Sequence, residues 1–258
     1  MTTASASTRG EKATRREWLG LIAIALPCMI YSMDLTVLNL AVPTLTRELK
    51  PSASQLLWII DIYGFMVAGF LMTMGTLGDR IGRRRLLMIG AAFFGVASTV
   101  AAFSNSAEML IAMRAVLGIA GATLAPSTLS LITVMFTDEK ERTFAISMWI
   151  ASFSAGAIIG PVVGGFLIEY FWWGSVFLIA VPPMLLLLAI GPILLPEYRA
   201  PNAGSLDVLS ALLSLAAVLS LVYGIKHWAA ESFDWLAAAA ILVGLAFVLI
   251  FIRRQKRL

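Results

Sequence analysis

Residues 75–85 read GTLGDRIGRRR, a short, glycine-containing and strongly basic stretch that separates two long apolar segments. The same alternation runs along the chain, because charges gather in short gaps between segments that are almost free of charge. Of the 258 residues, 60% are hydrophobic and 13% are charged, whereas ordinary soluble domains are about 45–50% apolar and about 25% charged. This organisation predicts a protein that crosses a membrane several times, and it excludes a secreted enzyme, a disordered regulator and a nucleic-acid binder.

Eight segments reach the roughly 20 apolar residues that a helix needs to cross a bilayer. Their apolar runs are continuous rather than alternating with period two, which favours helices over a β-barrel. The predicted fold class is therefore all-α, a polytopic membrane protein of eight transmembrane helices. The expected spans are residues 18–41, 57–78, 86–106, 109–135, 143–168, 174–195, 206–226 and 236–252.

The 19 Lys and Arg residues fall mostly on one side of the membrane that these spans imply. Arg47, Lys50 and Lys226 lie on the other side, and Arg114 lies inside a span. By the positive-inside rule the basic side is cytoplasmic, so both termini are expected inside, as an even number of spans requires. The basic side holds four residues in 1–17, four in 79–85, two in 137–142, one in 196–205 and four in 253–258, which makes fifteen.

Several kinds of chemistry drop out on residue counts. One cysteine, Cys28, and one histidine, His227, cannot form an intramolecular disulfide or a Cys/His zinc cluster, so no metal site is expected. The sequence contains no Gly-Lys dipeptide and hence no Walker-type phosphate loop. No span carries a Ser-His pair or a cluster of His, Asp and Glu, so neither an enzyme nor a bound cofactor is expected. Solute movement would have to use a gradient or another subunit's energy.

Three charged residues lie inside the predicted spans, namely Asp34, Asp61 and Arg114. A lone charge at the centre of a bilayer costs several kcal/mol, so such residues face a cavity or each other. Counting along the helices places all three in the outer half, where they could meet. Asp34 and Arg114 would then load and release a proton or admit a cation, or they would form a static pair that fixes helix packing. Asp61 lies closer to the interface, where snorkelling is the alternative to a role in transport.

The stretch at residues 75–85 resembles the G-x-L-x-D-R-x-G-R-[RK] signature of the major facilitator superfamily and matches it at every defining position. The resemblance implies a gating loop on the cytoplasmic side. Within it, the glycines permit close helix approach and a turn, and the carboxylate ends the helix and bonds to Arg or to a helix N-terminus. The implied gating residues are Gly75, Asp79, Arg80, Gly82 and Arg83.

Three further segments are similar to motifs of the same superfamily. Residues 110–118 look like its fourth-helix motif, whose arginine, here Arg114, is associated with proton transfer. Residues 33–43, which contain Asp34, look like the first-helix motif of the 14-helix drug:proton antiporters. A third segment is similar to the antiporter signature G-x-x-x-G-P-x-x-G-G, in which small residues allow tight helix packing and proline softens the helix. Its defining residues are Gly156, Gly160, Pro161, Gly164 and Gly165.

The resemblance implies export of small lipophilic, cationic substrates in exchange for protons across a bacterial inner membrane. Asp34 and Asp61 would recognise positive charge, and Arg114 would tune the Asp34 carboxylate. Aromatic and methionine side chains would line an adaptable pocket through cation–π and soft apolar contacts. The candidates for that lining are Tyr31, Trp58, Tyr63, Phe65 and Met66.

Transporters of this superfamily have two six-helix halves and hold their substrate between them. The likeness ends before the second half. A truncated or split antiporter, a half-size protein that pairs with itself or with another chain, and a non-transporting relic are all open. A fourth possibility is an accessory membrane subunit that regulates another transporter, so a missing C-terminal half or second subunit is an expected partner. The predicted domains are a cytoplasmic tail at 1–17, a six-helix bundle at 18–195, a cytoplasmic linker at 196–205, two added helices at 206–252 and a basic cytoplasmic C-terminal segment at 253–258.

Overall fold

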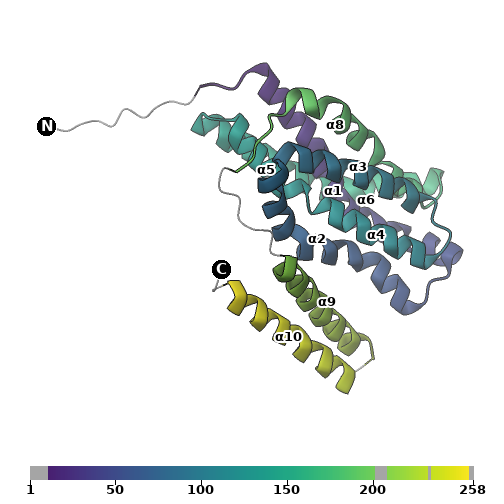
Figure 1. Cartoon of the computed structure of the whole chain (residues 1–258). Helices are drawn as coiled ribbons and strands as arrows, with labels where there is room; N and C mark the ends of the chain where they lie inside the picture. Colours follow the sequence, from purple (N-terminus) through teal and green to yellow (C-terminus); the bar gives the residue numbers. More distant parts are fainter. Residues whose placement is uncertain (1–10, 201–207, 232–233, 256–258) are drawn as a thin grey trace.

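The computed structural model describes residues 11–200, 208–231 and 234–255, and within them every regular element is a helix (Figure 1). The predicted all-α class is therefore confirmed. Parts of the predicted tail, linker and basic C-terminal segment lie outside the described residues. The helices are α1 (Arg15–Leu49), α2 (Ala53–Ile81), α3 (Arg83–Ala102), α4 (Ala107–Gly121), α5 (Leu124–Met135), α6 (Glu139–Tyr170), α7 (Ser175–Leu178), α8 (Val181–Leu194), α9 (Val208–Glu231) and α10 (Trp235–Gln255).

Seven stretches of helix among the described residues are long and apolar enough to cross a membrane. They correspond to the first six predicted spans and to the last one. The remaining predicted span, 206–226, coincides with α9. Among the described residues its apolar stretch is Leu212–Ile225, which is shorter than the other seven. Residues 206 and 207 of that span lie outside the described residues.

The predicted span 109–135 corresponds to one membrane-crossing stretch, Ala107–Met135, but a turn divides this stretch into two helices. α4 ends at Gly121, two residues turn, and α5 begins at Leu124. Pro126 has no N–H to donate to the carbonyl four residues earlier, so an uninterrupted helix would lose a hydrogen bond at this point. The turn packs closely on α3, where a Cβ at Gly90 would overlap the Thr123 side chain.

The span predicted at 174–195 is interrupted for a similar reason. The four-residue helix α7 ends at Leu178, and α8 begins at Val181. Pro182 and Pro183 occupy the first turn of α8. They have no N–H groups to donate to the carbonyls of Leu178 and Ile179, which a continuous helix would require. A proline in the first turn is tolerated because the N–H groups there have no partner within the helix.

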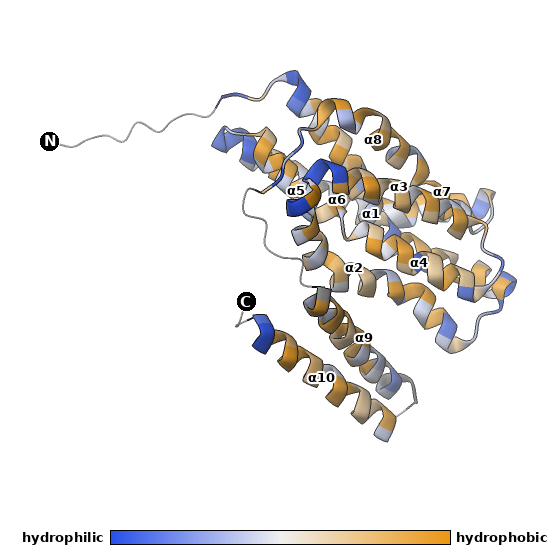
Figure 2. Cartoon of the chain, viewed as in Figure 1, coloured by the Kyte–Doolittle hydropathy of each residue, from blue (hydrophilic) through white to orange (hydrophobic). Residues whose placement is uncertain are grey.

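The connections between helices gather at two ends of the bundle, as helices of alternating direction require. At one end, which we call the basic end, Ala13 N–H donates to Glu141 at 2.7 Å, and Arg83 N–H donates to the Tyr198 carbonyl at 2.9 Å. At the opposite end, Trp173 Nε1 donates to Glu48 at 2.7 Å. Figure 2 shows hydrophilic residues at the helix ends and apolar residues along the helix bodies.

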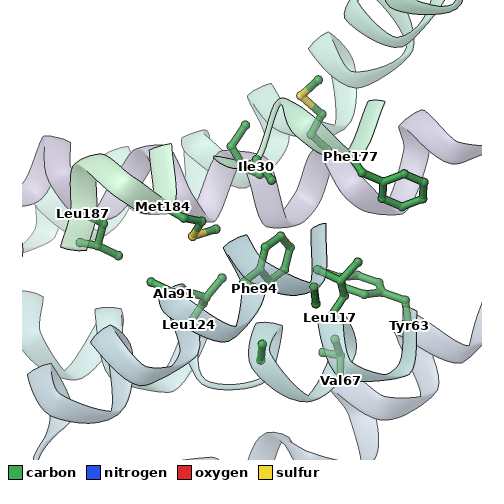
Figure 3. Close-up of a cluster of buried hydrophobic side chains, with 14 of the residues drawn as sticks. Ile30, Tyr63, Val67, Ala91, Phe94, Leu117, Leu124, Phe177, Met184 and Leu187 are labelled. Carbon is green, nitrogen blue, oxygen red and sulfur yellow. The ribbon is translucent and has the colours of Figure 1, made fainter. Parts of the chain in front are cut away.

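A buried apolar core joins α2, α3 and α4 on one side to α1, α7 and α8 on the other (Figure 3). Phe94 and Leu117 sit near its centre and are fully buried. α9 and α10 pair with each other and reach the bundle through α2 (Figure 1). That contact is close, because a Cβ at Gly69 would lie 2.7 Å from Cδ1 of Leu215.

The most extensive helix pairing in the bundle joins α1 to α6. Three buried glycines four residues apart, Gly156, Gly160 and Gly164, form the α6 face of this contact. A Cβ at Gly156 would overlap the Met29 carbonyl oxygen, and one at Gly164 would overlap a methyl group of Val37. Backbone therefore packs directly on backbone here, which is how small residues drive helix association in membranes.

Replacing Gly156 by Ala is therefore expected to destabilise the bundle by about 1–3 kcal/mol, because the added methyl meets backbone that cannot rotate away. Gly165→Ala is the matched control, since a Cβ there would lie an ordinary 4.0 Å from Cδ1 of Leu40. Thermal unfolding of the purified protein in detergent measures both. Equal stability of the two variants would show that the α1–α6 contact is looser than the structure has it.

Candidate functional site

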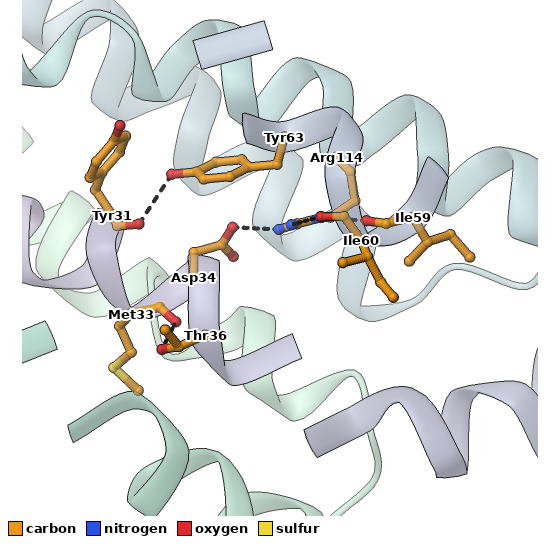
Figure 4. A network of polar contacts seen from close by, with 8 residues as sticks. All are labelled: Tyr31, Met33, Asp34, Thr36, Ile59, Ile60, Tyr63 and Arg114. Carbon is orange, nitrogen blue, oxygen red and sulfur yellow. Dashed lines mark hydrogen bonds and ion pairs between the residues drawn. The ribbon is translucent and has the colours of Figure 1, made fainter. Parts of the chain in front are cut away.

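Asp34 of α1 and Arg114 of α4 form an ion pair in the interior of the bundle (Figure 4). Only 6% of Asp34 and 1% of Arg114 is exposed. The two side chains come from helices separated by 80 residues of sequence, and the Arg114 Nη1 group donates to Asp34 Oδ2. Because a buried charge needs a partner of opposite sign, this pairing explains how both residues are tolerated inside a membrane segment.

Arg114 has further partners, all on α2. Its Nε donates to the Ile59 carbonyl at 3.1 Å, and its Nη2 donates to the Ile60 carbonyl at 3.3 Å. The guanidinium carbon lies 4.7 Å from the centroid of the Tyr63 ring, close enough for a cation–π contact. The guanidinium is therefore held by α2 as well as by Asp34. Asp34, in contrast, is paired with a single cationic side chain, that of Arg114.

Local sequence explains how the three helices come so close. A Cβ at Gly118 of α4 would lie 2.6 Å from the Met66 Cβ, and one at Gly121 would lie 3.1 Å from the Tyr31 ring. On α1, the Thr36 hydroxyl donates to the Met33 carbonyl at 3.1 Å, which satisfies this side chain within its own helix beside Asp34. Small residues on α4 thus let α1 and α2 approach the turn that carries Arg114.

The other charge predicted in the membrane, Asp61, is half-buried on α2, directly after Ile60. Asp34 lies further from the C-terminal end of its helix than predicted, because α1 continues past the expected end at residue 41 to Leu49. The structure thus brings Asp34 and Arg114 together and places Asp61 next in the chain to a carbonyl that holds Arg114.

Two of the predicted lining residues, Tyr31 and Tyr63, lie beside the pair with ring centroids 6.0 Å apart. Trp58 and Phe65 contact each other edge to face at 6.3 Å. Trp149 and Phe153 of α6 are not among the predicted lining residues, yet they extend the aromatic cluster, since Phe153 packs 5.6 Å from Tyr31. Their spacing from Gly156 by seven and three residues puts them on the glycine face, a periodicity that could have identified them.

The predicted gating loop lies at the basic end, twenty residues along α2 from Ile59 and thus about 30 Å away. Asp79 Oδ1 accepts a hydrogen bond of 2.6 Å from Arg83 Nη2, as predicted for this carboxylate. α2 continues past Asp79 to Ile81, and Gly82 then turns the chain with φ of +110°, a value that favours glycine. Arg80 is exposed.

Close approach in this loop occurs at Gly78 and not at Gly75. A Cβ at Gly78 would lie 2.9 Å from the Arg83 Cδ, whereas one at Gly75 would make an ordinary 3.9 Å contact with Pro126. A segment after α8, which is part of the predicted linker at 196–205, covers the loop. Arg84 bonds to Glu197 at 3.5 Å, and Ala200 N–H donates to the Asp79 carbonyl at 3.1 Å.

The predicted antiporter motif lies against the helix that carries the buried carboxylate. A Cβ at Gly160 would overlap the Thr36 hydroxyl and lie 3.1 Å from the Met33 Cγ, and both residues lie within two positions of Asp34 on α1. Pro161 is exposed, and Gly165 is half-exposed. No group of three or more His, Cys, Asp or Glu side chains that could hold a metal occurs in the part of the chain that the structure describes.

Comparison with known proteins gives consistent relatives. The profile of the Major Facilitator Superfamily matches residues 24–253. The multidrug efflux pump LfrA of Mycolicibacterium smegmatis is 49% identical over 242 residues, which are 94% of this chain and 48% of the relative. The methyl viologen resistance protein SmvA of Salmonella typhimurium is 42% identical over 241 residues, 93% of this chain and 49% of the relative.

Among solved structures, a bacterial homologue of the human lysosomal transporter Spinster, in an inward-facing and unoccupied conformation, matches with a TM-score of 0.62. The identity is 18%, and the match covers 93% of this chain and 61% of that structure, so it shows the fold alone. The chain spans about half the length of the relatives LfrA and SmvA.

Arg114→Met is expected to destabilise the protein by about 3–5 kcal/mol, because it leaves the Asp34 carboxylate buried without its cation. Adding Asp34→Asn to that variant should recover a large part of the loss, since no charge then remains uncompensated. Glu197→Gln, which breaks the partly exposed pair with Arg84, should cost less than about 1 kcal/mol. Unfolding in detergent measures all three, and a double variant less stable than Arg114→Met would contradict the buried pairing.

Proposed function

The chain belongs to the major facilitator superfamily, and from this premise we propose that it supplies one half of an efflux pump that exchanges lipophilic cations for protons. Membership places it among integral membrane transporters rather than enzymes. The pump would work in a bacterial inner membrane, with the basic end and both termini in the cytoplasm, as the distribution of Lys and Arg favours.

The observation that carries the proposal is the buried pair of Asp34 and Arg114. One carboxylate that faces a fixed guanidinium can accept either a proton or a substrate cation in place of that guanidinium. Because the two ligands compete for the same oxygen atoms, binding of one expels the other. Competition at a single site is sufficient for antiport when the site opens alternately to the two sides of the membrane.

The surroundings of the pair support a lipophilic cation as the substrate. The rings of Tyr31 and Tyr63 lie beside the pair, Phe153 packs on Tyr31, and aromatic rings attract cations through their faces. The relative SmvA is named for resistance to methyl viologen, which is an aromatic dication. Asp61, on α2, would be a second carboxylate that recognises positive charge.

Two further regions would supply the conformational change. The α6 glycines let α1 and α6 pack backbone to backbone, so a movement of α6 is passed directly to the helix that bears Asp34. The loop from Gly75 to Arg83 would gate the cytoplasmic side, held by its internal bond between Asp79 and Arg83. Protons, the substrate and membrane lipid are then the proposed partners of this half, together with a C-terminal half or a second subunit.

The second candidate function is that of a half-size or accessory membrane subunit, which would need a partner chain and would not transport alone. Purified chain in liposomes with an imposed pH gradient distinguishes this case. Uptake of tetraphenylphosphonium by the chain alone would exclude an accessory role.

Asp34→Asn in the native product is expected to abolish efflux of tetraphenylphosphonium from cells, because an amide neither exchanges a proton nor carries the charge that binds the cation. Glu169→Gln is the control, since Glu169 is an exposed carboxylate on α6 far from the pair in sequence. It should keep efflux within about twofold of the wild type. Efflux is measured as cellular accumulation, with membrane levels of each variant checked by immunoblot.

Wild-type efflux by the Asp34→Asn protein would refute the proposed exchange at this carboxylate. In that case Asp34 and Arg114 would be a static pair that serves helix packing. Loss of efflux in both variants would assign the effect to assembly of the protein and would equally remove the support for Asp34.

A further inference from the structure

Tyr63 connects the two sides of the buried ion pair. It is fully buried, and its ring lies beneath the Arg114 guanidinium at 4.7 Å. Its hydroxyl donates to the Tyr31 carbonyl at 3.2 Å, three residues before Asp34 on α1 (Figure 4). One side chain of α2 therefore contacts the cation on α4 and the backbone of the helix that carries the carboxylate.

The position of Tyr63 leaves it little freedom to move. A Cβ at Gly121 would lie 3.2 Å from its hydroxyl oxygen, and one at Gly118 would lie 3.2 Å from its carbonyl carbon. Phe94 packs edge to face on the other side, with centroids 6.5 Å apart. The ring is thus held between α1, α3 and α4 and presents a fixed face to the guanidinium.

We propose that Tyr63 is a positioning residue, which keeps Arg114 in place while Asp34 is released from it. The released state belongs to the exchange cycle proposed above, and the inference rests on that function to this extent. In the released state the guanidinium retains the Ile59 and Ile60 carbonyls and the ring face, all supplied by α2. Arg114 therefore stays aligned to receive the carboxylate again.

The ring matters most when the carboxylate is absent. With Asp34 in place, the guanidinium has a charged partner, and loss of the ring removes one of several restraints. Without Asp34 the guanidinium has only neutral partners, and a buried cation in that condition depends strongly on each of them. The contribution of the ring is thus expected to depend on the state of Asp34, whereas a ring that only fills space contributes equally in both states.

A double-mutant cycle on the stability of the chain itself tests this dependence. Asp34→Asn holds the site in the released condition, and Tyr63→Leu removes the ring. In detergent, Tyr63→Leu should lower the melting temperature by about 3 °C more in the Asp34→Asn background than in the wild-type background. Tyr63→Phe keeps the ring and should show no such difference between the two backgrounds.

Phe136→Leu is the matched control, because Phe136 is another fully buried aromatic residue and lies at the basic end, away from the pair. Its effect should be the same in both backgrounds. If Tyr63→Leu alone does not fold, Tyr63→Met gives the same comparison with a longer side chain. If the double variant with Tyr63→Leu does not fold, the double variant with Tyr63→Met gives the comparison.

Equal effects of Tyr63→Leu in the two backgrounds would overturn the positioning role. Non-additivity of Tyr63→Phe as large as that of Tyr63→Leu would overturn it as well, by assigning the effect to the hydroxyl. Neither result depends on transport, so failure of this inference is distinguishable from failure of the proposed exchange. An absence of efflux in the wild type would remove the proposed function and leave the cycle measurable.

Discussion

The charge on Arg114 is the constraint around which α1, α2 and α4 are arranged. A guanidinium in the interior of a membrane bundle must be neutralised and hydrogen-bonded. Asp34 supplies the neutralising charge, and the carbonyls of Ile59 and Ile60 accept from two further nitrogens. These partners come from α1 and α2, so satisfying one side chain of α4 fixes the relative positions of three helices.

The small residues of the chain make that arrangement possible. Gly118 and Gly121 bring α4 against α2 and α1, and the glycine face of α6 supports α1 from the other side. Since lipid competes equally well for apolar side chains, close backbone contact supplies much of the packing in a membrane. Two of the segments that carry the family likeness, residues 110–118 and the glycine motif of α6, are thus also segments in which helices approach closely.

Much of this could be predicted from the sequence, because bilayer thickness and the cost of buried charge are strict constraints. They identified the helical class, the spans and the partnership of Asp34 with Arg114. Local geometry was less accessible: Pro126 and the pair Pro182-Pro183 divide predicted spans, although Pro27, Pro43 and Pro161 lie within unbroken helices. The helical spacing from Gly156 indicates the face on which Trp149 and Phe153 lie, but the contact of Glu197 with Arg84 depends on tertiary packing, which no short motif encodes.

The central claim is that one carboxylate serves the proton and the cation in turn, and the pH dependence of cation affinity tests it most directly. Tetraphenylphosphonium should bind the native product more weakly as the pH is lowered, with a slope that approaches about tenfold per pH unit for one competing proton. Asp34→Glu should keep this slope, and Asp34→Asn should bind at least about tenfold more weakly without it. A wild-type affinity that does not change with pH would contradict exchange at Asp34.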